Sequence, residues 1–253
     1  VRVLEADAVI EFENDRINYC ENDQPFLITG VNLPDVIGTF TIEGGVGLTD
    51  HHNNTATVNP SLLDINQYTV TYSYVDGTTL SVTHDFNVGK MPEADFNWAT
   101  ECYQEGQSVF LKNTSVSTFG NITDTSFLWK INTPTGFDQY TTRNVTHVFP
   151  QAGNHTIVLE MENSYGCIST ITKTFPLRPT RALSGETYFE DFETQPISWQ
   201  KGKPEELPVN SWKLGDPEKG FAGAFSGEYC WYTYIAGSTA PIEQSWITSP
   251  CFN

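Results

Sequence analysis

Apolar and polar residues alternate along several segments of this chain, and the alternation restricts what the chain can fold into. In residues 68–74 and again in 155–161, large side chains take every second position and Thr, Ser, Val or Glu stand between them. A period of two is typical of a strand with one buried and one solvated face in an antiparallel sheet. No window of a dozen residues shows an amphipathic helical stripe. The sequence therefore predicts an all-β protein.

A weak internal repeat groups these strands into modules. Glu5-Ala6-Asp7 recurs as Glu93-Ala94-Asp95, and each copy is followed by a short apolar strand. The segment Gln67–Val70 matches Asn154–Ile157 at nearly the same offset. Short strands separated by frequent turns are typical of a β-sandwich, which needs about 100 residues. The offset of roughly 88 residues therefore predicts tandem sandwiches.

The repeat sets the expected domain boundaries. We expect one immunoglobulin-like sandwich at 8–90, a second sandwich at 91–179, and the end of a preceding module at 1–7. The segment Phe175–Arg181 holds two prolines and two arginines, which suggests a semi-rigid linker. Residues 182–253 contain four of the six Trp residues but no copy of the repeat, so we expect the first half of a third β domain there. The chain is then expected to be part of a longer one.

The charge balance excludes several classes of function. The chain has 31 Asp and Glu against 13 Lys and Arg, a formal net charge of −18. Nucleic acids and anionic membrane surfaces both attract basic proteins, so we expect neither as a partner. Hydrophobic residues make up 38% of the sequence, which is enough to build cores and excludes disorder as the reason for the charge. No apolar run approaches the 18 residues of a membrane span, so no membrane insertion is expected.

The second module resembles the PKD (polycystic kidney disease) repeat, an immunoglobulin-like sandwich. The resemblance rests on four segments: Val109–Ser115, Phe127–Trp129, His147–Leu159 and Asn163–Cys167. It covers about 80 residues. One departure is the segment Lys130–Gly136, which stands where the family has a turn rich in Asp and Gly.

The flanking modules resemble other domains of large surface proteins. Residues 19–25 and 68–72 look like the Ig-like repeats of large Bacteroidota surface proteins. Residues 189–193, 211–212 and 245–252 resemble their MAM-like jelly-roll domains, so residues 182–253 are expected to form part of a jelly roll. The combination is similar to gliding-motility adhesins that are exported by type IX secretion.

This resemblance implies a non-enzymatic part of a large secreted, cell-surface adhesin. Its sandwiches would be spacers that present a distal region for adhesion or gliding motility. The expected partners are other modules of the same chain, with surface polysaccharide or the secretion and motility machinery as further candidates. The second hypothesis is an accessory, carbohydrate-binding region of a secreted hydrolase. No G-x-S-x-G, H-E-x-x-H or C-x-x-C motif is present, and no catalytic residue is predicted.

The five cysteines form an odd set. The family resemblance implies a disulfide between Cys102 and Cys167, at corresponding ends of one module; two reduced buried thiols are the alternative. Cys230 and Cys251 stand on neighbouring expected strands and form a second candidate pair. This pairing leaves Cys20 as a lone thiol without the His or Asn context of a nucleophile.

Two further groups are candidates for ligand binding. Glu190, Asp191 and Glu193 offer hard oxygen ligands for Ca²⁺, although no EF-hand pattern surrounds them. No other cofactor is expected. Tyr229 and Trp231 share one strand face and could stack on a sugar ring, with packing in a core as the alternative.

Overall fold

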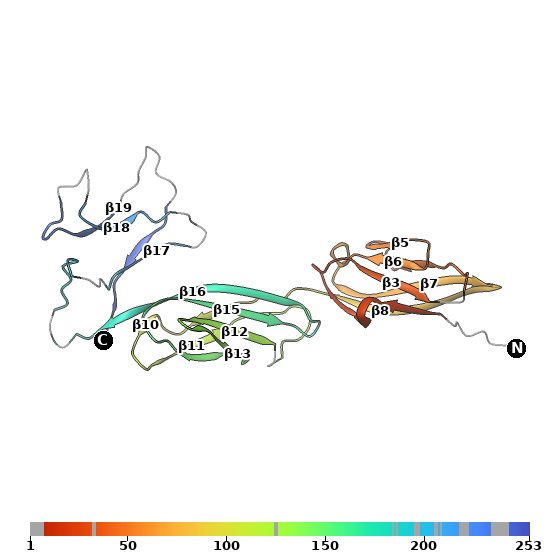
Figure 1. The fold of residues 1–253 in the computed structure, drawn as a ribbon, viewed down its shortest axis with the longest axis horizontal. Coiled ribbons are helices and arrows are strands. Elements are labelled where there is room, and N and C mark those ends of the chain that lie inside the picture. Colours follow the sequence, from red (N-terminus) through yellow and green to blue (C-terminus); the bar gives the residue numbers. More distant parts are fainter. Residues whose placement is uncertain are drawn as a thin grey trace. The chain divides into compact units, whose positions relative to one another are not determined.

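The computed structural model describes residues 8–31, 34–123, 126–183, 185, 187–194, 198–204, 207, 209–217, 223–233 and 243–253. These residues form β-strands and two short 3-10 helices, η1 (Glu13–Asp15) and η2 (Pro60–Leu62), with no α-helix among them (Figure 1). The all-β prediction is confirmed. None of the described helices has the length and apolar character needed to span a bilayer. The module end expected at 1–7 lies outside the described residues.

The contacts divide the chain into two compact units, each built from several segments. The first consists of residues 1–97, 111–145 and 157–173, and the second of 98–110, 146–156 and 174–253. The first unit contains one complete sandwich, and the strands of the next sandwich extend through both units. The domain boundaries expected from the sequence stay a prediction.

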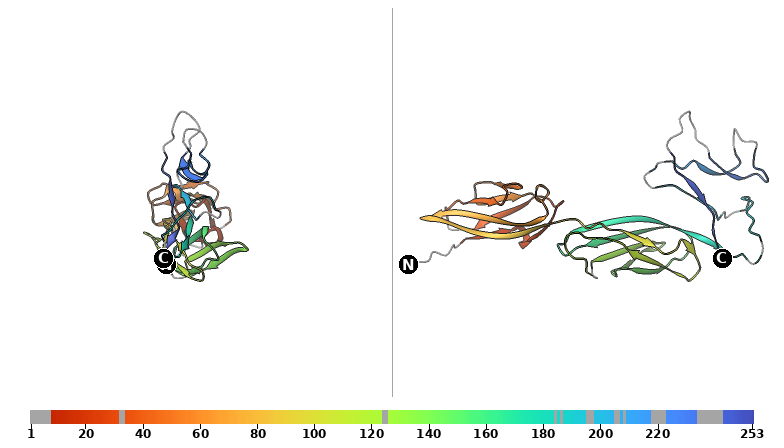
Figure 2. Two further views of the ribbon diagram at one scale, coloured as in Figure 1. Left: turned by 90° about the vertical axis from the view of Figure 1, so that its left-hand side faces the viewer. Right: turned by 180° about the vertical axis from the view of Figure 1, so that it is seen from behind.

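The first sandwich has the strand order of an immunoglobulin domain. One sheet has the order β1-β3-β6-β5, and the facing sheet has the order β2-β8-β7-β4. The two layers are drawn in red to yellow in the ribbon views (Figures 1 and 2). In immunoglobulin lettering these are A-B-E-D and A′-G-F-C. The strands are β1 (Val9–Phe12), β2 (Asn18–Cys20), β3 (Phe26–Val31), β4 (Thr39–Ile42), β5 (Leu48–Asp50), β6 (Thr55–Val58), β7 (Asn66–Asp76) and β8 (Thr78–Gly89).

The alternation predicted for residues 68–74 builds the core of this sandwich. Val70, Tyr72 and Tyr74 of β7 are buried. The ring of Tyr72 packs against the backbone of β3, where a Cβ atom at Gly30 would come within 2.5 Å of the ring. Only a glycine leaves room for the ring there. The buried hydroxyl of Tyr72 donates to Asn54 Oδ1 at 2.6 Å, which satisfies its polar end.

The second sandwich repeats this topology. One sheet has the order β14-β11-β9 and the other contains β10-β16-β15-β12-β13. The letters are A-B-E and A′-G-F-C-C′, and in both sandwiches the short A′ strand pairs in parallel with strand G. The strands are β9 (Phe96–Trp98), β10 (Cys102–Tyr103), β11 (Ser108–Asn113), β12 (Phe127–Thr133), β13 (Gly136–Tyr140), β14 (Val145–Val148), β15 (Gly153–Glu162) and β16 (Ile168–Arg181).

The match between Gln67–Val70 and Asn154–Ile157 has a structural basis. Tyr68 near the start of β7 donates its hydroxyl proton to the carbonyl of Asp64 at 3.0 Å, the tyrosine corner of immunoglobulin sandwiches. At the same place in β15, the His155 Nε2 atom lies 3.0 Å from the carbonyl oxygen of Gln151. Both side chains tie the start of strand F to the loop before it. A histidine thus replaces the tyrosine in the second sandwich.

The segment predicted as a linker is part of a strand. Phe175–Arg181 forms the last half of β16, and Phe175 and Leu177 are buried in the sandwich. The linker prediction was wrong because prolines are compatible with a strand wherever the missing N–H is not needed by a neighbour. Pro179 pairs with Tyr103 at the two-residue strand β10.

The C-terminal residues form small sheets. β17 (Gln200–Gly202) pairs with β20 (Trp246–Thr248), and β18 (Trp212–Gly215) pairs with β19 (Cys230–Thr233). β21 (Cys251–Phe252) adds in parallel to the end of β16. The jelly roll expected for 182–253 stays a prediction.

Candidate functional site at the module junctions

The disulfides lie between modules. Cys20 of the first sandwich is bonded to Cys167 of the second, and Cys102 of the second sandwich is bonded to Cys251 in the C-terminal segment. The Cα separations are 5.6 and 5.7 Å, in the usual range for a disulfide. Cys230 is free. The expected pairs Cys102–Cys167 and Cys230–Cys251 are therefore wrong, and Cys20 is not a lone thiol.

The geometry of strand G explains why the pair implied by the family resemblance does not form. Cys102 lies beside Arg178, near the C-terminal end of β16, whereas Cys167 immediately precedes the first residue of that strand. A rise of ~3.3 Å per residue separates the two positions by roughly 35 Å. A disulfide requires Cα atoms within about 7 Å. Each of these cysteines is thus available to a different module.

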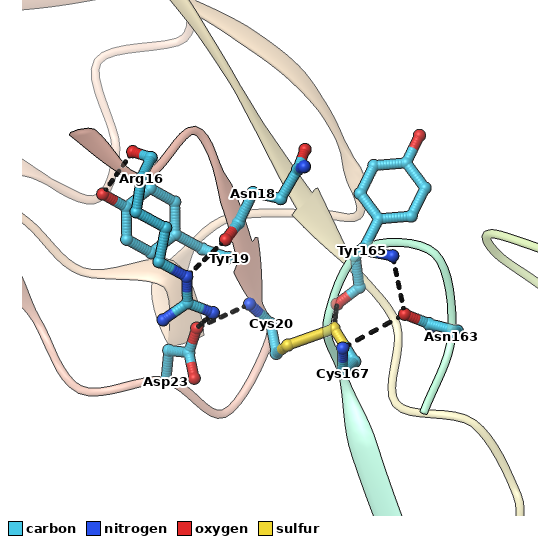
Figure 3. A network of polar contacts seen from close by, with 9 residues as sticks. Arg16, Asn18, Tyr19, Cys20, Asp23, Asn163, Tyr165 and Cys167 are labelled. Atoms are coloured by element: carbon cyan, nitrogen blue, oxygen red, sulfur yellow. Dashed lines mark hydrogen bonds and ion pairs between the residues drawn. A yellow bond between two sulfur atoms is a disulfide. The ribbon is translucent and has the colours of Figure 1, made fainter. Parts of the chain in front are cut away.

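A polar network holds Cys20 in place (Figure 3). Asp23 Oδ2 accepts a hydrogen bond from the backbone N–H of Cys20 at 2.9 Å and forms an ion pair with Arg16. The Arg16 guanidinium carbon lies 4.7 Å from the centre of the Tyr19 ring, and the Tyr19 hydroxyl donates to the Arg16 carbonyl at 2.8 Å. Burial raises the pKa of Tyr19 to about 12, so this phenol stays protonated and remains a donor.

Asn163 organises the turn that carries Cys167 (Figure 3). Its side chain is buried, and its Oδ1 atom accepts from the backbone N–H groups of Tyr165 at 3.0 Å and Cys167 at 3.1 Å. Its Nδ2 atom donates to the carbonyls of Lys90 at 3.0 Å and Phe119 at 3.1 Å. Lys90 directly follows the last strand of the first sandwich. One buried amide therefore joins the connection between the sandwiches to the cysteine-bearing turn.

Hydrogen bonds and close packing complete this first junction. The backbone N–H of Glu21, next to Cys20, donates to the carbonyl of Gly89 at 2.9 Å. The Glu21 carboxylate accepts a hydrogen bond from the backbone N–H of Met91 at 3.0 Å. The side chain of Tyr165 passes so close to Gly89 that a Cβ atom there would lie 3.3 Å away. We call the residues 20–21, 89–91, 163–167 and 119 the first junction.

The second junction repeats this plan with different partners. Cys102 stands on the A′ strand of its sandwich, as Cys20 does, and its partner Cys251 lies on β21, where it pairs with Thr180 at the end of β16. Backbone bonds continue the attachment, from Asn253 N–H to the Arg181 carbonyl at 3.2 Å. In both junctions a cysteine on strand A′ is bonded to the module that follows.

One signal in the sequence indicated this pairing. The bonded cysteines are 147 and 149 residues apart, so the two pairs are near-copies displaced by about one repeat. Shifting the first pair along the sequence by about one repeat places Cys20 on Cys102 and Cys167 on Cys251. The cysteines of one pair are thus equivalent to those of the other. The family resemblance pointed instead to a bond within one module.

The proposed calcium ligands do not gather. Glu193 Oε1 accepts from the backbone N–H groups of Glu228 at 2.7 Å and Tyr229 at 2.8 Å, and Asp191 Oδ1 accepts from the N–H of Glu193 at 3.0 Å. Glu190 accepts a bond from the hydroxyl of Tyr188 at 3.2 Å. No group of three metal-ligating side chains occurs in the described part of the chain. These carboxylates stabilise loops.

The two aromatic residues proposed for sugar stacking take different positions. Trp231 lies on β19 opposite Leu214 and lines a cavity of about 260 Å³ together with Trp212 and Tyr232. Its indole N–H is buried without a hydrogen-bond partner among the described residues. Tyr229 precedes the strand, is 38% exposed and does not line this cavity. The structure therefore separates the pair.

No protein-family model and no curated protein matches this sequence. Solved structures do resemble it. The PKD1 domain of Epp from Vibrio anguillarum is 24% identical over 34% of this chain and 92% of that one, with a TM-score of 0.28. A fragment of titin is 15% identical over 67% of this chain and 66% of that one, with a TM-score of 0.43. Fibronectin(III)-like modules of Clostridium thermocellum CbhA are 11% identical over 68% and 95%, with a TM-score of 0.41.

These similarities concern fold and transfer no function, since every TM-score is below 0.5. The assignment of the two sandwiches as Ig-like rests on their strand order, which the structure gives directly.

Proposed function

We propose that this chain is a non-enzymatic spacer and presentation region of a large secreted cell-surface adhesin, in which each sandwich is covalently tied to the module that follows it. The observation that carries the proposal is the forward pairing of the A′ cysteines, Cys20 with Cys167 and Cys102 with Cys251. A tandem array joined only by short peptides bends freely at each connection. A disulfide beside the connection adds a second attachment point and restricts that bending.

The disulfides support an extracellular location, and the charge suits a long spacer. Disulfides persist in oxidising compartments and are rare in the cytosol, where thiols are kept reduced. The net charge of −18 keeps a long chain of sandwiches soluble and self-repelling. The resemblance of the sequence to gliding-motility adhesins adds to the proposal a bacterial surface, export by type IX secretion and a role in adhesion or gliding.

A distance measurement tests the restriction of bending. Spin labels are placed on exposed strand positions of the first and second sandwiches, and pulsed electron resonance gives the distribution of distances between them. We expect a narrow distribution in the oxidised protein and a broad one in a Cys20→Ser/Cys167→Ser variant. The variant Cys102→Ser/Cys251→Ser is the control and keeps the narrow distribution. An equally broad distribution in all three proteins would contradict the proposal.

The surface location is tested separately on cells of the organism that makes the protein. An antibody against the first sandwich should label intact cells, and protease added outside should remove the label. Labelling only after the cells are broken open would place the protein inside and refute the adhesin assignment.

A further inference from the structure

The second compact unit contains a cavity of about 570 Å³ that the disulfide junctions do not use. Its size falls in the range of pockets that bind small ligands. One wall is the outer face of β16, since Thr174, Pro176 and Arg178 alternate with the buried Phe175 and Leu177. The opposite wall is the small sheet of β17 and β20. Further lining residues are Trp98 at the end of β9, Glu101 in the loop that follows, Asn154 on β15, and Asn210.

Two tryptophans line this cavity. Trp246 on β20 is 47% exposed. Its indole lies directly on the backbone of Gly202, where a Cβ atom would come within 2.5 Å of Nε1. The second ring, Trp98, is held by a hydrogen bond from its Nε1 atom to Glu101 Oε1 at 3.1 Å. Both rings are therefore fixed in orientation before any ligand binds.

The charge of the cavity is opposite to that of the chain. Arg178, Lys201 and Lys203 line it with one carboxylate, Glu101, whereas acidic residues outnumber basic ones by more than two to one in the whole sequence. Cations in a partly enclosed site create a local positive potential and attract anions even when the net charge is negative.

The Arg178 side chain lines this cavity and is held by its neighbours. Its Nε atom is buried and makes no hydrogen bond within the described residues; the nearest carboxylate oxygen of Glu101 is 3.7 Å away. Its NH1 group donates to the carbonyl of Ser249 at 3.3 Å, which keeps the side chain in place. Because these contacts use Nε and NH1, the rest of the guanidinium is the part that can meet an anion in the cavity.

We propose that this cavity binds an acidic glycan of the uronic-acid type. The indole of Trp246 offers a π face to the C–H bonds of a sugar ring, and the carboxylate of the sugar pairs with Arg178 and Lys203. Gln200 also lines the cavity and offers an amide to the ring hydroxyls. A small inorganic anion makes no use of two indoles, and a neutral glycan makes no use of three cations. This inference goes beyond the spacer role, because it gives the chain a ligand of its own.

The test uses the whole chain, with its disulfides verified by peptide mapping. The probe is a short oligogalacturonide, compared with a neutral malto-oligosaccharide of equal length, and binding is followed by calorimetry and tryptophan fluorescence. We expect the acidic probe to bind at least tenfold more tightly and its affinity to fall as salt is added.

Variants locate the site. We expect Trp246→Ala to weaken binding roughly tenfold, from the loss of one stacking contact. Lys203→Gln should weaken the acidic probe only, and Gly202→Ala should weaken it by displacing the indole. Trp231→Ala and Lys213→Gln are matched controls from β18 and β19 that do not line this cavity, and they should leave binding unchanged.

Three results would overturn the proposal. These are the absence of binding to the oligogalacturonide, equal affinity for the neutral probe, and loss of binding in Trp231→Ala with retention in Trp246→Ala. The last result would place the sugar in the smaller cavity on β19. None of these results bears on the distance measurement for the disulfide junctions, so the two proposals fail independently.

Discussion

Breaking the two disulfides should nearly triple the length to which the chain can be stretched. The perturbation is removal of the bonds by reductant or by Cys→Ser variants, with Cys230→Ser in every protein to prevent exchange. Because the bonds overlap, the shortest covalent path between the ends runs from Cys20 to Cys167, back along the chain to Cys102, and across to Cys251. This path contains about 86 residue steps, or roughly 310 Å at ~3.6 Å per residue.

The comparison lengths follow from the same geometry. Without disulfides, the 253 residues extend to roughly 900 Å. A chain with only one of the two bonds follows a path of roughly 370 to 380 Å, whichever bond remains. The pairing of Cys102 with Cys167 and Cys230 with Cys251 would instead give roughly 600 Å in the protein with all five cysteines.

Single-molecule stretching with handles at both ends measures these lengths. The fully extended oxidised protein should reach about a third of the reduced length, and the two single-bond variants should agree with each other. A second measurement, on the protein that retains Cys230, distinguishes the overlapping pairing from the alternative of Cys102 with Cys167 and Cys230 with Cys251, because the two give lengths of roughly 310 and 600 Å. An oxidised length near 900 Å, or single-bond variants that differ strongly, would refute the overlapping pairing.

Three further predictions concern individual residues. Trp129→Ala should lower the free energy of unfolding by about 3–5 kcal/mol in urea titration, because this fully buried indole fills the core of the second sandwich; a loss below 1 kcal/mol would contradict that placement. Asn163→Ala should destabilise the protein by about 2–4 kcal/mol, since it removes the hydrogen bonds to the N–H groups of Tyr165 and Cys167 and to the carbonyls of Lys90 and Phe119, and amide hydrogen exchange at Cys167 should rise. The hydrogen bond from Lys173 holds the pKa of Asp95 below its usual value. The pair therefore stabilises the protein fully at pH values above the pKa of Asp95 in the unfolded chain. This stabilisation is lost as the pH falls through the lowered pKa of Asp95 in the folded protein. Asp95→Asn should therefore cost under about 1 kcal/mol at neutral pH and almost nothing in acid, because the pair is partly exposed; an equal loss at both pH values would exclude the ionic contribution.

Local patterns in the sequence predicted the strands well, because a strand's alternation records its burial directly. Tyr72 and Ile157 lie in the cores as their alternating positions indicate. The repeat located Tyr68 and His155 at equivalent corners, although the replacement of a phenol by an imidazole hides the shared hydrogen bond. The prolines of Phe175–Arg181 misled the prediction, since composition does not show whether a residue's N–H faces a neighbouring strand.

The cavity and the disulfides depend on contacts between distant residues. Trp98, Arg178 and Trp246 come from three separate parts of the sequence and meet only because β16 is long enough to receive both β10 and β21. No short motif records such a meeting. The disulfides did leave a trace, in the nearly equal spacing of the two bonded pairs.

Stability alone does not explain why these bonds join successive modules. In the chain-entropy model, a bond between cysteines 147 residues apart contributes about 5 kcal/mol, and one spanning 65 residues within a sandwich contributes about 4 kcal/mol. The difference is too small to decide between the two arrangements.

The two arrangements differ more in which residues carry a mechanical load. The overlapping bonds place residues 21–101, which include β3 to β8, outside the shortest covalent path between the ends. Tension on the chain then passes through β1, β2 and Cys20 to the disulfide, and Tyr72 on β7 lies outside the loaded path. A bond between Cys102 and Cys167 would shield the second sandwich and leave the first one in the line of force, whereas the forward pairing shields residues 21–101 and leaves residues 102–167 on the loaded path. The forward pairing therefore selects the second sandwich as the module that bears the tension.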